Sequence, residues 1–314
     1  MDILSDMIFC PALSERDMDL ERRVVMEEIA MYEDSPEDVV YDLFARTVWG
    51  DTPMGRAILG TAEALGDITP DSMRRYIKEH YTSKSIVIAV SGNFGDDLFD
   101  KLDRYFGRRD INDNAVEKAS YSPAKAIDKR DFEQVQLVAG FNGIDIYDES
   151  VYALLVFNNV FGSGMSSRLF QNIREKYGLV YSIGAGHSAY IGTGTFDISA
   201  GMSPDNVEHV AELITSEIKK IKEEKLSDEE IERAKIQLRG NYILANENVG
   251  ARMQSIGRTV LLNKPLKTQD EVISKIMAVT AEDTAEIIDR VLDTSTLSVV
   301  AAGPIDSTDG MFVF

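Results

Sequence analysis

Two glutamates lie where a helix would present its apolar residues. If residues 20–34 (LERRVVMEEIAMYED) form a helix, its 3.6-residue period places Glu21 and Glu28 in the same arc as Val24 and Met31. One interpretation is a half-buried helix whose carboxylates reach solvent at its rim, because glutamate is rarely buried without a partner. The other is that they face a cation, so that one carboxylate binds zinc and the second orients a histidine ligand. The helical pattern leaves both interpretations open.

A second pair of residues combines two hydrogen-bond donors. In residues 162–186 (GSGMSSRLFQNIREKYGLVYSIGAG), Arg174 lies in the last turn of a predicted helix, Gly178 is a plausible C-cap, and Tyr181 begins a predicted strand. The break between helix and strand can bring a guanidinium and a phenol to one rim, as in sites that bind peptide carbonyls or oxyanions. The alternative is an arginine that caps its own helix and a tyrosine packed in the sheet. The GSG at 162–164 has no surrounding phosphate-loop or dinucleotide motif, so we exclude a nucleotide site there.

The three histidines do not form a metal-binding motif. His80, His187 and His209 are not spaced as HExxH, HxxEH or a histidine–cysteine cluster. His80 ends a predicted helix and His209 lies in a polar one, so we expect both at the surface. The given sequence, taken alone, therefore holds no complete zinc site.

The elements that must position these residues are organised as a repeat. Residues 69–92 and 280–303 each read as a helix that starts at threonine with an acid in its first turn, followed by a β-branched strand and a glycine. Residues 17–25 and 228–236 share a Glu-Arg pair at matching positions. Both pairs of segments are 211 positions apart, which indicates a tandem duplication.

The repeat also predicts the domain organisation. The second copy starts near a strand at 133–141, whose counterpart in the first copy would fall about eighty positions before Met1. We therefore expect the first domain to be N-terminally truncated. The predicted division is the C-terminal part of the first domain at 1–107, a polar linker at 108–130, and a second, homologous domain at 131–314.

Hydrophobic periodicity favours an α+β fold in which each copy packs helices on one face of a mainly antiparallel sheet. The helices do not alternate regularly with strands, which disfavours a doubly wound parallel sheet. Helices are predicted at 2–9, 14–33, 36–48, 70–81, 95–106, 148–161, 166–176, 204–224, 227–246, 248–262, 269–277 and 281–292. Strands are predicted at 85–91, 134–141, 180–190, 193–201 and 296–302.

Composition excludes several classes of protein. The 314 residues are 44% hydrophobic and 27% charged, as in ordinary globular proteins. A formal net charge of −20 argues against nucleic acid or anionic lipid as a partner and favours basic peptides. The sequence has no apolar run long enough for a membrane span. Its single cysteine, Cys10, cannot form an internal disulfide, which suits a reducing compartment, and we expect a cytoplasmic protein.

Four stretches carry a family resemblance. They are ERRVVMEEIAMYEDSPEDVVYDLF (21–44), GRAILGT (55–61), YTSKSIVIAVSGNF (81–94) and the segment 162–186 quoted above. Together they resemble the inverzincin zinc peptidases, the family of pitrilysin, insulin-degrading enzyme and mitochondrial processing peptidase. The match is closest to the bacterial, single-chain branch that is similar to processing peptidase, and it spans essentially the whole chain.

The resemblance assigns roles to the residues singled out above. In this family two histidines of an HxxEH helix and a downstream glutamate hold Zn²⁺, and Glu28 matches that glutamate. Glu21 matches the acid that supports the zinc ligands, whereas Arg174 and Tyr181 match the pair that binds substrate backbone and stabilises the tetrahedral intermediate. HxxEH itself is missing. The family spacing would put it about 75 residues before Glu28, ahead of Met1.

We therefore expect the larger part of a zinc metalloendopeptidase that holds an extended peptide in a chamber between its domains, and that is inactive without HxxEH. The competing interpretation is a non-catalytic partner subunit of a heterodimeric peptidase, which would contribute only Arg174 and Tyr181. A purely structural scaffold is a third interpretation. Single-chain members of the family commonly pair, so the resemblance allows a homodimer.

Overall fold

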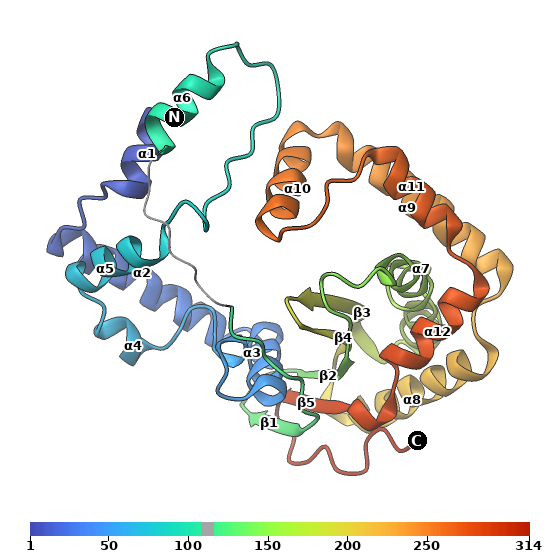
Figure 1. Ribbon diagram of the computed structural model, residues 1–314. Coiled ribbons are helices and arrows are strands. Elements are labelled where there is room, and N and C mark those ends of the chain that lie inside the picture. The colour runs from blue at the N-terminus through green and yellow to red at the C-terminus, as the bar shows by residue number, and fades with distance from the viewer. Residues whose placement is uncertain (108–115) are drawn as a thin grey trace. The chain divides into compact units, whose positions relative to one another are not determined.

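The computed structural model describes residues 1–107 and 116–314 (Figure 1). Within them the chain forms two compact units. The first unit comprises residues 1–29, 59–116 and 242–268, and the second comprises 30–58, 117–241 and 269–314. No helix in the described part of the chain is both long and apolar enough to cross a bilayer.

The two units exchange equivalent segments. Residues 30–58 come from the first copy of the repeat but belong to the second unit, whereas 242–268 come from the second copy and belong to the first unit. A shift of 211 positions converts the first of these segments into 241–269, so the two are counterparts. Their helices are α3 (Pro36–Trp49) and α10 (Val249–Leu261). Each copy therefore completes its unit with a helix taken from the other.

The second unit is built on one sheet of five strands in the order β1-β5-β2-β4-β3. The β1–β5 pairing is parallel and the other three are antiparallel. The prediction of a mainly antiparallel sheet is confirmed, and four of its strands were predicted. The exception is β1, which falls in the predicted linker. The strands are β1 Lys125–Lys129, β2 Val135–Asn142, β3 Val180–Tyr190, β4 Thr193–Met202 and β5 Ser298–Gly303.

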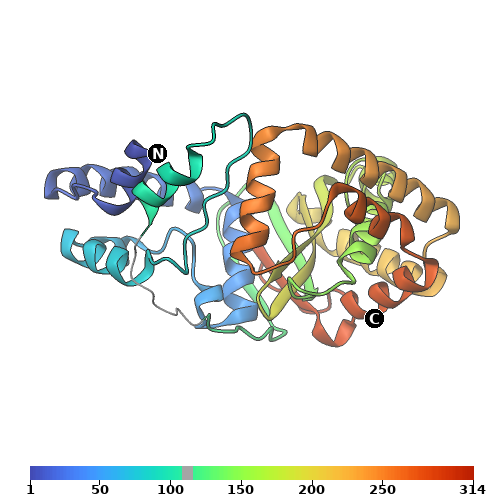
Figure 2. The same cartoon turned by 45° about the horizontal axis from the view of Figure 1, so that its top comes forward.

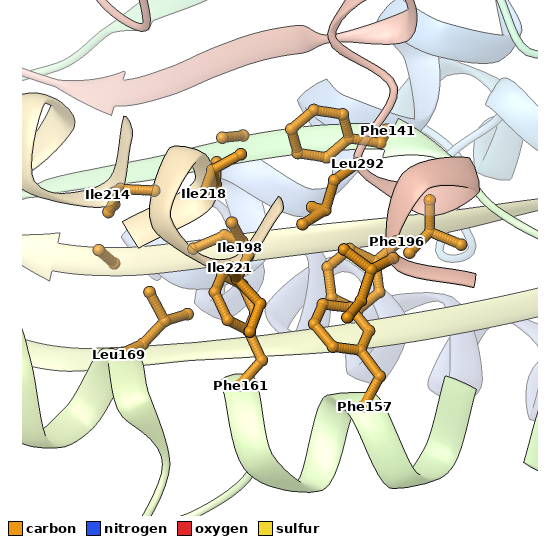
Figure 3. Close-up of a cluster of buried hydrophobic side chains, with 14 of the residues drawn as sticks. Phe141, Phe157, Phe161, Leu169, Phe196, Ile198, Ile214, Ile218, Ile221 and Leu292 are labelled. Atoms are coloured by element: carbon orange, nitrogen blue, oxygen red, sulfur yellow. The ribbon is translucent and has the colours of Figure 1, made fainter. Parts of the chain in front are cut away.

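One face of this sheet carries the main hydrophobic core (Figure 3). The rings of Phe157 and Phe161 stack at 5.2 Å between centroids, and Phe157 lies 5.4 Å from Phe196 of β4. Ile214 and Ile218 follow at the helical spacing that lines one face. Each fully buried side chain of this size contributes about 1.5–3 kcal/mol relative to exposure. The helices of this unit, besides α3, are α7 Val151–Phe161, α8 Val207–Glu224, α9 Asp228–Glu247 (as far as Asn241), α11 Gln269–Ala278 and α12 Ala281–Val291.

Helix α3 covers part of the opposite face. It begins where the Ser35 side chain accepts a hydrogen bond from the backbone of Asp38, and it ends before Gly50, whose φ is +58°. Its buried residues form a second cluster with Val138 of β2 and Val300 of β5. Those two side chains point away from the main core because side chains alternate along a strand. Without α3 they would be exposed.

The first unit is almost entirely helical and has very little core. Arg22 ties α2 (Glu15–Glu33) to α4 (Ala62–Gly66) and to the residues that follow it, because its guanidinium donates to the carbonyls of Leu65 at 3.4 Å and Ile68 at 2.9 Å. Leu98 is buried, whereas α2, α5 and α10 bury no residue. The sequence did not predict α4. The helices are α1 Asp2–Phe9, α2 Glu15–Glu33 (as far as Ile29), α4 Ala62–Gly66, α5 Pro70–His80, α6 Leu98–Phe106 and α10.

The predicted strand at 85–91 is wrong. Residues 86–91 have no strand hydrogen bonds, and Ile88 is 41% exposed, whereas its counterpart Val299 in β5 is fully buried. β5 is a strand because β1 and β2 pair with it, and the described part of the first unit holds no strand that could do the same. Helix α10 lies beside the segment, since a Cβ placed on Gly257 would be 3.2 Å from that of Ala89 (Figures 1 and 2).

Candidate functional site

The glycine-rich stretch packs against the edge strand β3. The Ala185 N–H donates to the Gly162 carbonyl at 3.1 Å. A Cβ on Gly162 would lie 2.3 Å from the Ala185 Cβ, a distance that real atoms do not reach. Glycine is therefore required at this position for close approach of two backbones, which explains the GSG without a phosphate.

An ion pair anchors the chain just after this stretch. The Arg168 guanidinium donates two hydrogen bonds to Glu230, at 2.8 and 2.9 Å, and a third to the Lys225 carbonyl at 3.3 Å. Burial disfavours the charged carboxylate, but hydrogen bonds from Arg168 and Ser227 outweigh it and lower the pKa of Glu230 to about 2. The bidentate geometry fixes the start of the segment that carries Arg174.

Arg174 lies on a π-helix, Phe170–Glu175, inside the predicted helix 166–176. The wider turn of a π-helix recurs at functional sites. The Arg174 guanidinium is exposed, lies 4.9 Å from the centroid of the Phe170 ring, and forms no salt bridge within the described residues. The carbonyl of Arg174 is capped instead by the N–H of Gly178 at 2.9 Å, where φ is +65°.

Tyr181 occupies a β-bulge. The register steps from Val180 opposite Met202 to Ser182 opposite Gly201, so Tyr181 is the extra residue between two paired ones. Bulges of this kind redirect a side chain, and Tyr181 is 63% exposed, not packed in the sheet. The π-helix packs against β3. Two donors, a guanidinium and a phenol, therefore stand on adjacent elements at the exposed edge of this sheet.

Glu21 and Glu28 lie on α2 in the first unit, and both side chains are exposed. The apolar stripe around them is exposed as well, with Leu20 at 48% and Val24 at 51%. The exposure of both carboxylates agrees with the interpretation as rim acids, although the apolar stripe beside them is exposed as well. Arg174 and Tyr181 both belong to the second unit.

The described residues do not form a zinc site by themselves. A structural or catalytic zinc needs three or four protein ligands at about 2 Å. In residues 1–107 and 116–314 no three His, Cys, Asp or Glu side chains converge on one point. Glu28 could supply one carboxylate. Among the histidines, His187 lies in β3, where burial lowers its pKa and favours the neutral ring.

Sequence reasoning missed a buried carboxylate on β4. Asp197 is 7% exposed, and its Oδ2 accepts a hydrogen bond from the Tyr41 hydroxyl of α3 at 3.1 Å. Burial raises the pKa of Asp197 to about 6, although the Tyr41 hydrogen bond partly opposes the shift. One signal was available: the acid sits between Phe196 and Ile198 in a strand that is otherwise apolar or small.

Comparisons with known proteins agree with this architecture. Family models described as "Peptidase M16 inactive domain" and "Insulinase (Peptidase family M16)" match residues 67–238 and 1–62. An uncharacterized zinc protease of Bacillus subtilis is 36% identical over 284 residues, which are 90% of this chain and 69% of that protein. One from Streptomyces coelicolor is 35% identical over 317 residues, covering 97% and 69%. The crystal structure of a peptidase M16 inactive domain from Pseudomonas fluorescens has a TM-score of 0.89 at 18% identity, covering 98% and 75%.

The α+β fold is therefore shared with a solved peptidase M16 inactive domain. The chain belongs to peptidase family M16, the insulinase family. The resemblance found in the sequence is thereby confirmed at family level. The expectations of zinc and of protease activity are also supported for the family, since the curated relatives are named zinc proteases.

Proposed function

We propose that this chain is the substrate-binding part of a zinc metalloendopeptidase that acts on extended peptides. The observation that carries the proposal is the pair of exposed donors at one end of β3, Arg174 and Tyr181. Both groups can donate to peptide carbonyls without first breaking a salt bridge in the described structure. Their chemistry also suits the oxygen of a tetrahedral intermediate, where charge develops during peptide hydrolysis.

The part of the β3 edge around Ile183, next to Arg174 and Tyr181, supports the binding mode, because at Ala185 the outward N–H is already bonded to the Gly162 carbonyl. A two-residue turn joins Tyr190 to Thr193, so alternate residues of β3 bond to β4. The intervening residues, among them Ile183 and His187, direct their N–H and C=O groups away from β4. An extended peptide can add to such an edge through main-chain hydrogen bonds. Arg174 and Tyr181 would then hold its carbonyls at one end.

We further propose that Glu28 is one carboxylate ligand of the family's zinc and that Glu21 supports a neighbouring ligand. The remaining ligands would be imidazoles that the described residues do not contribute. When bound, zinc would supply a polarised water for peptide hydrolysis. Binding and orientation of the peptide are the parts of the reaction that this chain's own residues can perform.

The binding role is tested by fluorescence anisotropy with a labelled, unstructured peptide. Arg174→Ala removes a charged donor and should weaken binding by about ten- to a hundredfold, and Tyr181→Phe should weaken it by about tenfold. The matched controls are Arg233→Ala, an exposed arginine of α9, and Tyr177→Phe, and both should bind as wild type. Equal affinity of all five proteins would overturn the proposal.

A second candidate is the non-catalytic partner subunit, which the description "inactive domain" of the matching family model favours. The two candidates differ at Glu28. In the complete translation product of the gene, Glu28→Gln should abolish zinc retention and peptide cleavage if the protein is the enzyme. A wild-type product that binds peptide but neither retains zinc nor cleaves would establish the partner role.

A further inference from the structure

Arg174 is held by an aromatic ring and not by a carboxylate. Its guanidinium carbon lies 4.9 Å from the centroid of the ring of Phe170, which comes earlier on the same π-helix. None of the ion pairs within residues 1–107 and 116–314 includes Arg174, although the protein has a formal net charge of −20. A cation over the face of an aromatic ring is attracted by the negative charge density of that face. The contact therefore restrains the guanidinium without neutralising it.

The neighbouring arginine shows how an ion pair would occupy the donors. Arg168 donates two hydrogen bonds to the Glu230 carboxylate and a third to the Lys225 carbonyl. An arginine side chain has five N–H donors, which project from the edge of its planar guanidinium. Because a phenyl ring has no lone pair, contact with Phe170 leaves the donors of Arg174 available for peptide carbonyls.

Phe170 is itself fixed by the segment that carries it. It is half-buried, and the neighbouring Leu169 and Ile173 are fully buried in the main core. The Phe170 N–H donates to the Ser167 hydroxyl at 3.4 Å, and that hydroxyl donates to the Gly164 carbonyl at 2.7 Å. A long arginine side chain, in contrast, has many rotamers to lose when it binds a ligand. The ring is therefore the fixed member of the pair.

We propose that Phe170 is a positioning residue that holds the Arg174 guanidinium ready for a peptide carbonyl. The inference rests on the proposed function, because the ring acts on the peptide only through Arg174. Restraining a flexible side chain before the ligand arrives reduces the conformational entropy that is lost on binding. An aliphatic side chain at position 170 would fill similar space but would not attract the cation. Loss of the ring should therefore weaken peptide binding by about fivefold.

The first test uses the labelled, unstructured peptide and fluorescence anisotropy. Phe170→Leu removes the ring and should bind about fivefold more weakly than wild type, whereas Phe170→Tyr keeps the ring and should bind as wild type. The matched control is Tyr177→Leu, which removes the contact between Lys176 Nζ and the Tyr177 ring at 5.2 Å and should also bind as wild type. The fluorescence of the buried Trp49 verifies that each variant is folded.

A double-mutant cycle separates positioning from a structural role. In the Arg174→Ala background, Phe170→Leu should leave the remaining affinity unchanged, because the ring has no guanidinium to hold. A ring that shaped the segment or touched the peptide would lower the affinity by the same factor in both backgrounds. That result, weak binding by Phe170→Tyr, or wild-type affinity of Phe170→Leu while Arg174→Ala binds weakly, overturns the inference alone. If Arg174→Ala binds as wild type, the proposed function fails as well.

Discussion

The substitution Asp197→Asn should stabilise the protein, and the gain should depend on pH. The pKa of Asp197 rises from 3.8 in the unfolded chain to about 6 in the folded protein. One pKa unit corresponds to 1.36 kcal/mol, so folding an ionised Asp197 costs on the order of 3 kcal/mol. Asparagine removes the charge, and its amide oxygen can still accept the hydrogen bond from Tyr41.

The direction of the pH dependence follows from the difference between the folded and unfolded pKa values of Asp197. Because the folded-state pKa is the higher one, the unfolded chain loses this proton first as the pH rises. The cost is therefore absent below about pH 3.8, grows between pH 4 and 6, and is complete above about pH 6. The free energy of unfolding of Asp197→Asn should exceed that of wild type by about 3 kcal/mol at pH 8, and the two should converge near pH 4.

Urea unfolding followed by tryptophan fluorescence measures this difference. Trp49 is the only tryptophan, is buried on α3, and lies edge-on to Tyr190 at 5.5 Å, so its signal reports the second unit. The comparison is between the two proteins at each pH, because the other acids titrate in both. A variant that is less stable than wild type at pH 8, or a difference that does not change with pH, would refute the reasoning.

Two further perturbations test the anchoring of the site. Arg168→Ala leaves the Glu230 carboxylate without its bidentate partner and should cost about 2 kcal/mol at pH 7 by urea unfolding. The pKa of Glu230 is lowered from 4.5 in the unfolded chain to about 2 in the folded protein. The stabilisation by the ion pair is therefore present above pH 4.5 and should vanish as the pH falls through 2. A cost of Arg168→Ala that does not change with pH would contradict the role of this ion pair. Gly162→Ala forces the loop off β3 and should weaken peptide binding several-fold at a cost of about 1–3 kcal/mol. Gly66→Ala, whose Cβ would meet no atom within 4 Å, is the matched control, and equal binding by both variants would exclude a positioning role for the loop.

Features that depend on neighbours along the chain could be predicted from the sequence. The helices starting after Thr69 and Thr280 both have capping boxes, as expected from a threonine followed by first-turn polar residues. The end of the helix at Gly178 and the start of β3 were also predicted. Caps and turn residues act within a few positions, so no tertiary information is needed to find them.

Features that depend on distant partners could not be predicted in this way. Residues 86–91 and β5 have similar sequences at equivalent positions of the repeat, yet only β5 is a strand. The difference lies in the neighbouring strands, because a strand is stabilised by hydrogen bonds to segments far away in sequence. The exchange of α3 and α10 between the two units could not be predicted either, because it also depends on contacts between segments far apart in sequence.

The sequence by itself thus determined the family, the repeat, the helices with their caps, and a pair of donors seven positions apart. Only the tertiary structure decided that Tyr181 sits in a bulge on an edge strand and that Asp197 is buried against Tyr41, 156 positions away. Burial and strand pairing depend on which surfaces of the folded chain come into contact. Helix caps and apolar periodicity depend only on residues a few positions apart in the sequence.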